Sequence, residues 1–157
     1  NELSWFNWSQ VEANGDLFRY FQKMVEFRHN HPALRNGHYF QYKDYNSVGC
    51  VDLTWFSTEA LAGDHEDERL TLAFMLCGAY AKGGIVEDDD IFVALNMHWE
   101  TQTYELPALA KGKAWHVFAN TGADAPEDIH EHGSEPRLED QRVLSLASRS
   151  VAVLVGR

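Results

Sequence analysis

The chain has 157 residues, about the size of one domain, and it is long enough to bury a single hydrophobic core. Its formal net charge of −11 disfavours binding to nucleic acid phosphates and to anionic lipid headgroups. With 45% apolar and 24% charged residues, the composition is that of an average globular protein. We therefore expect a folded domain with neither nucleic acid nor membrane as partner, and its acidity is compatible with a neutral ligand such as a sugar.

One strongly helical segment lies near the N-terminus, from Asp16 to Arg28. Its apolar residues recur mostly at steps of three and four, the period of a single helical face. The residues of this predicted face are Leu17, Phe21, Met24 and Val25. Asp16 is suited to be the N-cap, and Pro32 ends the pattern. Because so short a helix is marginal in water, we expect the face to dock on the rest of the domain or on a second copy of the chain.

After Asn36 and Gly37 the pattern becomes strand-like, so we place a domain boundary between residues 1–36 and 37–157. Short runs rich in aromatic and β-branched residues predict about eight strands. The predicted strands are His38–Asp44, Cys50–Phe56, Leu70–Cys77, Ile91–Asn96, Thr101–Leu106, Ala114–Asn120, Val143–Leu146 and Ser150–Val155. Because no helical segment separates them, we expect a mainly β fold, an antiparallel Greek-key β-sandwich preceded by one amphipathic helix.

Cys50 and Cys77 are the only cysteines, and each lies in a predicted strand. Buried cysteine behaves as a small apolar residue, so we expect two free thiols, with a disulfide as the alternative. Free thiols favour a reducing compartment, and we expect a cytoplasmic location. The sequence begins with Asn1 rather than Met, and we expect it to be part of a longer protein.

Acidic residues occur mainly in runs, a pattern typical of solvated turns. We interpret Glu87–Asp90 and the group Asp64, Glu66, Asp67 and Glu68 in this way, with a cation site such as calcium as the alternative. Glycoside hydrolysis needs two carboxyl groups held in a dry cleft, and no such pair is evident. A nucleophile elbow and a phosphate-binding glycine loop are also absent from the sequence, so we expect no catalytic residue and no cofactor.

Histidines occur at two places that deserve separate interpretations. His130 and His132 are of a metal-binding type, but they lack a second pair at helical spacing. We therefore interpret residues 122–140 as a polar loop, mobile or functional, and expect no metal site. His29 and His31 flank the predicted helix end, where capping is the expected role.

Aromatic residues are the remaining candidates for a ligand-binding role, because sugars stack on the rings of Trp and Tyr. Trp55, Trp99 and Trp115 lie in the strand region, and we expect them in the core or at a domain interface. Trp5 and Trp8 lie outside any strong element, and they are our candidate substrate-binding residues.

Two stretches of the chain carry a family resemblance. Asn-Glu-Leu-Ser-Trp-Phe-Asn-Trp at 1–8 is followed by Phe-Arg-His-Asn-His-Pro-Ala-Leu at 27–34. The β-region then reads Ile-Phe-Val-Ala-Leu-Asn at 91–96 and Ala-Ser-Arg-Ser-Val-Ala-Val-Leu at 147–154. In this order the stretches resemble the C-terminal region of glycogen-debranching enzymes and isoamylases of the α-amylase superfamily, glycoside hydrolase family 13. Phe27 stands where that family usually has Leu.

The resemblance implies that the helix is the last one of a (β/α)8 catalytic barrel and that the catalytic carboxylates lie upstream of Asn1. It implies a parent hydrolase acting on α-1,6-glucosidic bonds without an organic cofactor. The chain would then be its non-catalytic C-terminal domain, with the preceding barrel as partner and the sandwich stabilising it. The alternative is an independent carbohydrate-binding module for α-glucans. A homodimer through the helix is the other contact that we consider.

Overall fold

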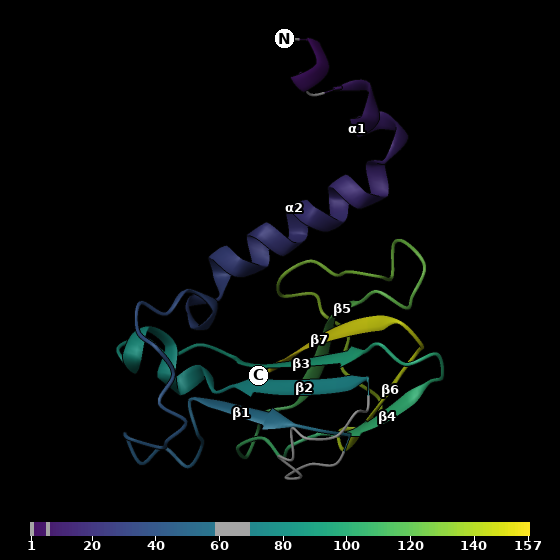
Figure 1. Ribbon diagram of the computed structural model, residues 1–157. Coiled ribbons are helices and arrows are strands. Elements are labelled where there is room, and N and C mark those ends of the chain that lie inside the picture. The colour runs from purple at the N-terminus through teal and green to yellow at the C-terminus, as the bar shows by residue number, and fades with distance from the viewer. Residues whose placement is uncertain (1, 6, 59–69) are drawn as a thin grey trace.

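The computed structural model describes residues 2–5, 7–58 and 70–157 (Figure 1). The helical elements are η1 (Glu2–Ser4), α1 (Ser9–Ala13), α2 (Gly15–Asn30), η2 (Pro32–Arg35) and η3 (Gly78–Gly83). The strands are β1 (Leu53–Phe56), β2 (Thr71–Leu76), β3 (Asp90–Asn96), β4 (Gln102–Glu105), β5 (Trp115–Asn120), β6 (Val143–Leu146) and β7 (Ser150–Gly156). Within the described ranges, no helix has the length and apolarity needed to cross a membrane.

The strands form two antiparallel sheets. Five strands make a sheet in the order β1-β2-β3-β7-β5, and β4 pairs with β6 in a second, two-stranded sheet. From β3 to β7 the chain passes from one sheet to the other at every step, so the two sheets form the layers of one sandwich. The predicted mainly β, antiparallel sandwich preceded by a helix is confirmed.

The five-stranded sheet is covered on both faces. Phe92 and Leu154 belong to the core cluster shared with the two-stranded sheet. Their neighbours Ile91 and Val155 belong to a second cluster, which includes Phe27 of α2. A strand buried on both faces has a continuous apolar sequence rather than an alternating one, which explains the composition of β3 and β7. Figure 1 shows α2 running across the top of this sheet. The domain boundary expected after residue 36 stays a prediction.

The first predicted strand is wrong: residues His38–Asp44 form an irregular segment. The carboxylate of Asp52 accepts the backbone N–H groups of Gln41 at 2.7 Å and Lys43 at 3.2 Å. A side chain therefore satisfies donors that a strand would offer to a neighbouring strand. The other seven predicted strands are confirmed, six of them with shifted ends and Val143–Leu146 with the predicted bounds.

Both ends of α2 differ from the predicted range of 16–28. Asn14, not Asp16, is the N-cap residue, and Asp16 lies in the first turn, where a negative charge still complements the helix dipole. The short helix α1 before it was not expected. At the other end the helix continues to Asn30, two residues beyond the predicted Arg28, and it ends before Pro32 as expected.

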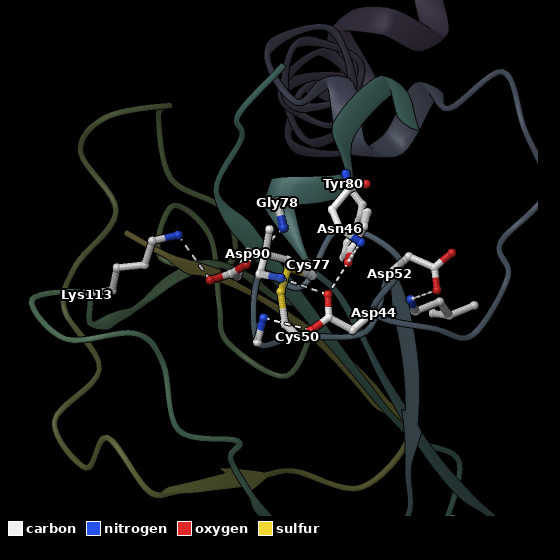
Figure 2. Close-up of a disulfide and its surroundings, with 12 residues drawn as sticks. Asp44, Asn46, Cys50, Asp52, Cys77, Gly78, Tyr80, Asp90 and Lys113 are labelled. Carbon is white, nitrogen blue, oxygen red and sulfur yellow. Dashed lines mark hydrogen bonds and ion pairs between the residues drawn. A yellow bond between two sulfur atoms is a disulfide. The ribbon is translucent and has the colours of Figure 1, made fainter. Parts of the chain in front are cut away.

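Cys50 and Cys77 form a disulfide, so the expectation of free thiols is wrong. Cys77 directly follows β2, and its N–H donates to the backbone oxygen of Asp52 at 3.3 Å, which folds the irregular segment over the end of the strand. The two Cα atoms are 6.3 Å apart, within the range that a disulfide spans. Figure 2 shows the bond beside the hydroxyl of Tyr80, which donates to the carboxylate of Asp44.

Candidate functional site

Helix α2 carries two apolar faces. The inner face is made of Tyr20, Met24 and Phe27, spaced by four and three residues, and it packs against the five-stranded sheet. Phe27 is 2% exposed, and its ring stacks on that of Phe118 with centroids 3.9 Å apart. Of the four residues of the predicted face, only Met24 packs against the sheet domain, and the alternative contact of Leu17, Phe21 and Val25 with a second copy stays a prediction. The helix does persist against the sheet domain, but through a different set of side chains.

The outer face of α2 is made of Leu17, Phe18, Phe21 and Val25. Their exposed fractions are 57%, 48%, 61% and 56%. Phe18, Phe21 and Val25 line a shallow depression of about 570 Å³ together with polar neighbours on the same helix. Contiguous exposed apolar side chains of this kind mark surfaces that bind another protein element.

Ion pairs fix α2 on the segment between β5 and β6. Arg19 bonds to Asp128 at 2.5 Å, and Lys23 pairs with Glu131 at 2.9 Å. Between these two acids, Ile129 is 1% exposed and belongs to the core. The interpretation of residues 122–140 as a purely polar loop is therefore wrong at its centre, where the segment packs under the helix.

A second anchor lies at the C-terminal end of α2. The Nδ1 of His31 lies 2.8 Å from the Oδ1 of Asp88, and the Oδ2 of Asp88 accepts the N–H of Ala33 at 2.8 Å. Burial by itself raises the pKa of Asp88, but the bonds from His31 and Ala33 outweigh it and leave the pKa below 3.8. His31 is the C-cap residue, as expected, but its ring is 1% exposed and has a packing role of its own.

The acidic run Glu87–Asp90 is not a solvated turn, contrary to the prediction. Asp90 is 7% exposed, and its carboxylate accepts the N–H of Gly78 at 2.9 Å and pairs with Lys113 at 3.1 Å (Figure 2). A Cβ at Gly78 would lie 2.0 Å from the backbone oxygen of Asp88, so only glycine allows this approach. Burial raises the pKa of Asp89. The second predicted acidic group, at 64–68, lies outside the described residues.

The tryptophans divide between core and surface. Trp115 is 1% exposed and Trp55 packs against the core, as expected. Trp99 is 67% exposed and stacks on His98, so it is not part of the core, and its placement at a domain interface stays a prediction. The candidate substrate-binding residues Trp5 and Trp8 are 71% and 76% exposed. They belong to the N-terminal elements, which in Figure 1 extend beyond α2 and away from the sheets.

Comparison with known proteins gives this fold a family. A family model described as isoamylase, C-terminal, matches residues 52–155. The chain is 27% identical over 125 residues to the glycogen operon protein GlgX homolog of Mycobacterium tuberculosis, covering 73% of this chain and 17% of that protein. It is 24% identical over 161 residues to an isoamylase of Flavobacterium sp, covering 98% of this chain and 20% of the relative.

A solved pullulanase from Bacillus acidopullulyticus shares the fold, with a TM-score of 0.56 and 22% identity over 96% of this chain and 15% of that one. The chain thus spans a fifth or less of the length of these relatives. The family resemblance seen in the sequence is confirmed. Because the family model matches well over half of its residues, including six of the seven strands in full, the chain belongs to the isoamylase C-terminal family.

Proposed function

We propose that this chain is the C-terminal part of a larger hydrolase of α-1,6-glucosidic bonds in glycogen or starch, and that it stabilises the catalytic barrel without contributing catalytic residues. The names of two relatives, isoamylase and GlgX homolog, support the enzyme class. The chain spans 17% and 20% of these relatives, which leaves ample length for a catalytic domain outside it.

The outer face of α2 is the observation that carries the proposal. Leu17, Phe21 and Val25 are exposed, and burying each of these side chains would contribute roughly 1.5–3 kcal/mol of stabilising free energy. This free energy is gained only if another surface covers the face. The helix itself is already fixed through its inner face and through two ion pairs. It therefore presents the outer face as a rigid, prepared surface, which lowers the ordering cost of docking.

A barrel fits this surface better than a second copy of the chain. A stable dimer buries about 1,200 Å² or more in total, whereas two copies joined through four side chains of one helix bury a narrow strip. At its N-terminal end α2 is preceded by α1 and η1, where a preceding domain would join the chain (Figure 1). A (β/α)8 barrel offers neighbouring helices and strands for exactly such a contact along the full length of α2.

Trp5 and Trp8 stay our proposed substrate-contacting residues, because their rings are exposed and they belong to the N-terminal segment before α2, which a preceding barrel would adjoin. Calorimetry with maltooligosaccharides on the 157-residue chain distinguishes this from a self-sufficient carbohydrate-binding module. We expect weak binding or none in the isolated chain. Micromolar affinity that Trp5→Ala and Trp8→Ala abolish would favour the module instead.

The docking proposal is tested with Phe21→Asp in the longer protein that contains this chain. We expect a lower melting temperature and an earlier thermal loss of pullulan hydrolysis, because a charge would be buried at the interface. Ile85→Asp is the matched control, since Ile85 is 86% exposed and belongs to the segment between η3 and β3 rather than to the outer face of α2. In the isolated chain both variants should melt like the wild type. Equal behaviour of the two variants in the longer protein, or a parent without a preceding catalytic domain, would overturn the proposal.

A further inference from the structure

A polar cavity of about 420 Å³ lies where three separate parts of the chain meet. His31 comes from the end of α2, Asp88 and Asp89 from the segment before β3, and His132 from the segment between β5 and β6. Because these three parts are far apart in the sequence, no spacing motif predicts that their side chains lie together. Neither α2 docking nor sugar contact uses this cavity.

One buried nitrogen in the cavity wall lacks a partner. The Nδ1 of His31 lies 2.8 Å from the Oδ1 of Asp88, a carboxylate oxygen that also accepts the N–H of Asp89, so Nδ1 carries the proton. A neutral imidazole then has its lone pair on Nε2. That atom is buried and has no hydrogen-bond partner among the described residues. A carboxylate that holds one ring nitrogen while the other stays bare is the arrangement of a metal-binding histidine.

Two more side chains complete a ligand set. The rings of His31 and His132 have centroids 5.4 Å apart. Two imidazoles on one tetrahedral zinc ion have centroids about 5 Å apart, because each nitrogen lies about 2 Å from the metal. One candidate ligand atom from each of His31, Asp88 and Asp89 lies within 4.8 Å of the others, and His132, whose side chain is 41% exposed, lies at the edge of this group. Asp88 already accepts N–H bonds from Ala33 and Asp89, whereas the carboxyl of Asp89 makes no bond or ion pair within the described residues.

A second buried carboxylate lies behind His132. One oxygen of Glu135 accepts a hydrogen bond from Arg157 at 2.6 Å. The other, Oε1, is buried without a hydrogen-bond partner in the described structure, 3.8 Å from the Nδ1 of His132. It lies at an ion-pair distance from His132, longer than the hydrogen bond between Asp88 and His31. The cationic side chain on the cavity wall, Lys113, is engaged by Asp90, so the site keeps its negative charge.

We propose that His31 Nε2, His132 and Asp89 bind one divalent metal ion of the zinc type, with Asp88 positioning His31 and a water molecule as the fourth ligand. Such an ion would tie the end of α2 to two segments of the sheet domain. Both cysteines are in the disulfide and do not compete for it. This inference goes beyond the proposed function and does not depend on barrel docking.

The test is isothermal titration of the untagged 157-residue chain with ZnCl₂, and in parallel with Co²⁺, whose visible absorption reports tetrahedral coordination. We expect one ion per chain. His132→Gln and Asp89→Asn should weaken binding at least about tenfold, and Asp88→Asn about 10- to 100-fold through the loss of orientation. His132 and Asp89 are partly exposed, so these substitutions should leave the fold intact, which circular dichroism checks.

His29→Gln and His130→Gln are matched controls, because both residues are near the site in sequence but do not line the cavity. They should bind zinc like the wild type. Zinc should also raise the melting temperature of the wild type and of both controls, but not that of His132→Gln. The absence of saturable binding, or binding that His132→Gln and Asp89→Asn leave unchanged, or equal loss in the two controls, would overturn the proposal.

Discussion

The inner and outer faces of α2 are both apolar, yet one is core and the other is surface. Phe27 on the inner face is 2% exposed, whereas Phe21 on the outer face is 61% exposed. The two are less than two helical turns apart and have the same side chain. The difference shows that apolar periodicity predicts a helix but does not tell which of two apolar stripes is buried in a given part of a protein.

The largest expected effect comes from the inner face. Phe27→Ala should lower the free energy of unfolding of the isolated chain by about 3–5 kcal/mol, because it leaves a cavity against Phe118. Phe18→Ala on the outer face should change it by less than about 0.5 kcal/mol. Urea unfolding of both variants measures the contrast, and similar losses for the two would contradict the division into faces.

The next effect concerns the opposite face of the sheet. Cys50→Ser should lower the free energy of unfolding by about 2–4 kcal/mol, because the disulfide closes a loop across a sequence separation of 27 residues. The change should leave the exposure of α2 unaltered. Thiol titration of the denatured, unreduced wild type should find no free thiol, and two reactive thiols there would contradict the assignment.

A smaller, pH-dependent effect on stability is expected from Asp88, which bonds to His31 at the C-terminal end of α2. The pKa of Asp88 is below 3.8 in the folded chain, so its stabilising contribution is present above that value and is lost as pH falls through the folded pKa. Asp88→Asn should therefore flatten the loss of stability on acidification below about pH 4, relative to the wild type. Unfolding in the presence of a chelator measures this, with Glu87→Gln as control. Parallel pH curves for the wild type and Asp88→Asn would be inconsistent with the anchor.

The smallest effect is expected from the ion pair of Lys23 with Glu131. Glu131 is 63% exposed, so solvent screens the pair, and Lys23→Gln should cost less than about 1 kcal/mol. High salt should reduce the difference from the wild type further. A loss above about 2 kcal/mol would mean that this pair, rather than apolar packing, holds the helix.

Local patterns were sufficient for the strands and the long helix, because their apolar runs and turn residues act over short distances. The irregular segment before β1 was missed because its backbone N–H groups donate to the side chain of Asp52, later in the sequence. This carboxylate takes the place of the neighbouring strand that would otherwise accept those hydrogen bonds. The disulfide and the pairing of His31 with Asp88 depend on tertiary contacts across 27 and 57 residues. For the pairing of His31, the sequence offers only the His31-Pro32 step at the end of the helix, and this step does not identify Asp88 as the partner.

The central claim is that the outer face of α2 is covered in the complete protein. Hydroxyl-radical footprinting of Leu17, Phe18, Phe21 and Val25 tests it most directly, by comparing the 157-residue chain with the longer protein that contains it. We expect strong labelling of all four residues in the isolated chain and marked protection in the longer protein, while the exposed Ile85 is labelled equally in both. Equal labelling of the outer face in the two proteins would contradict the account.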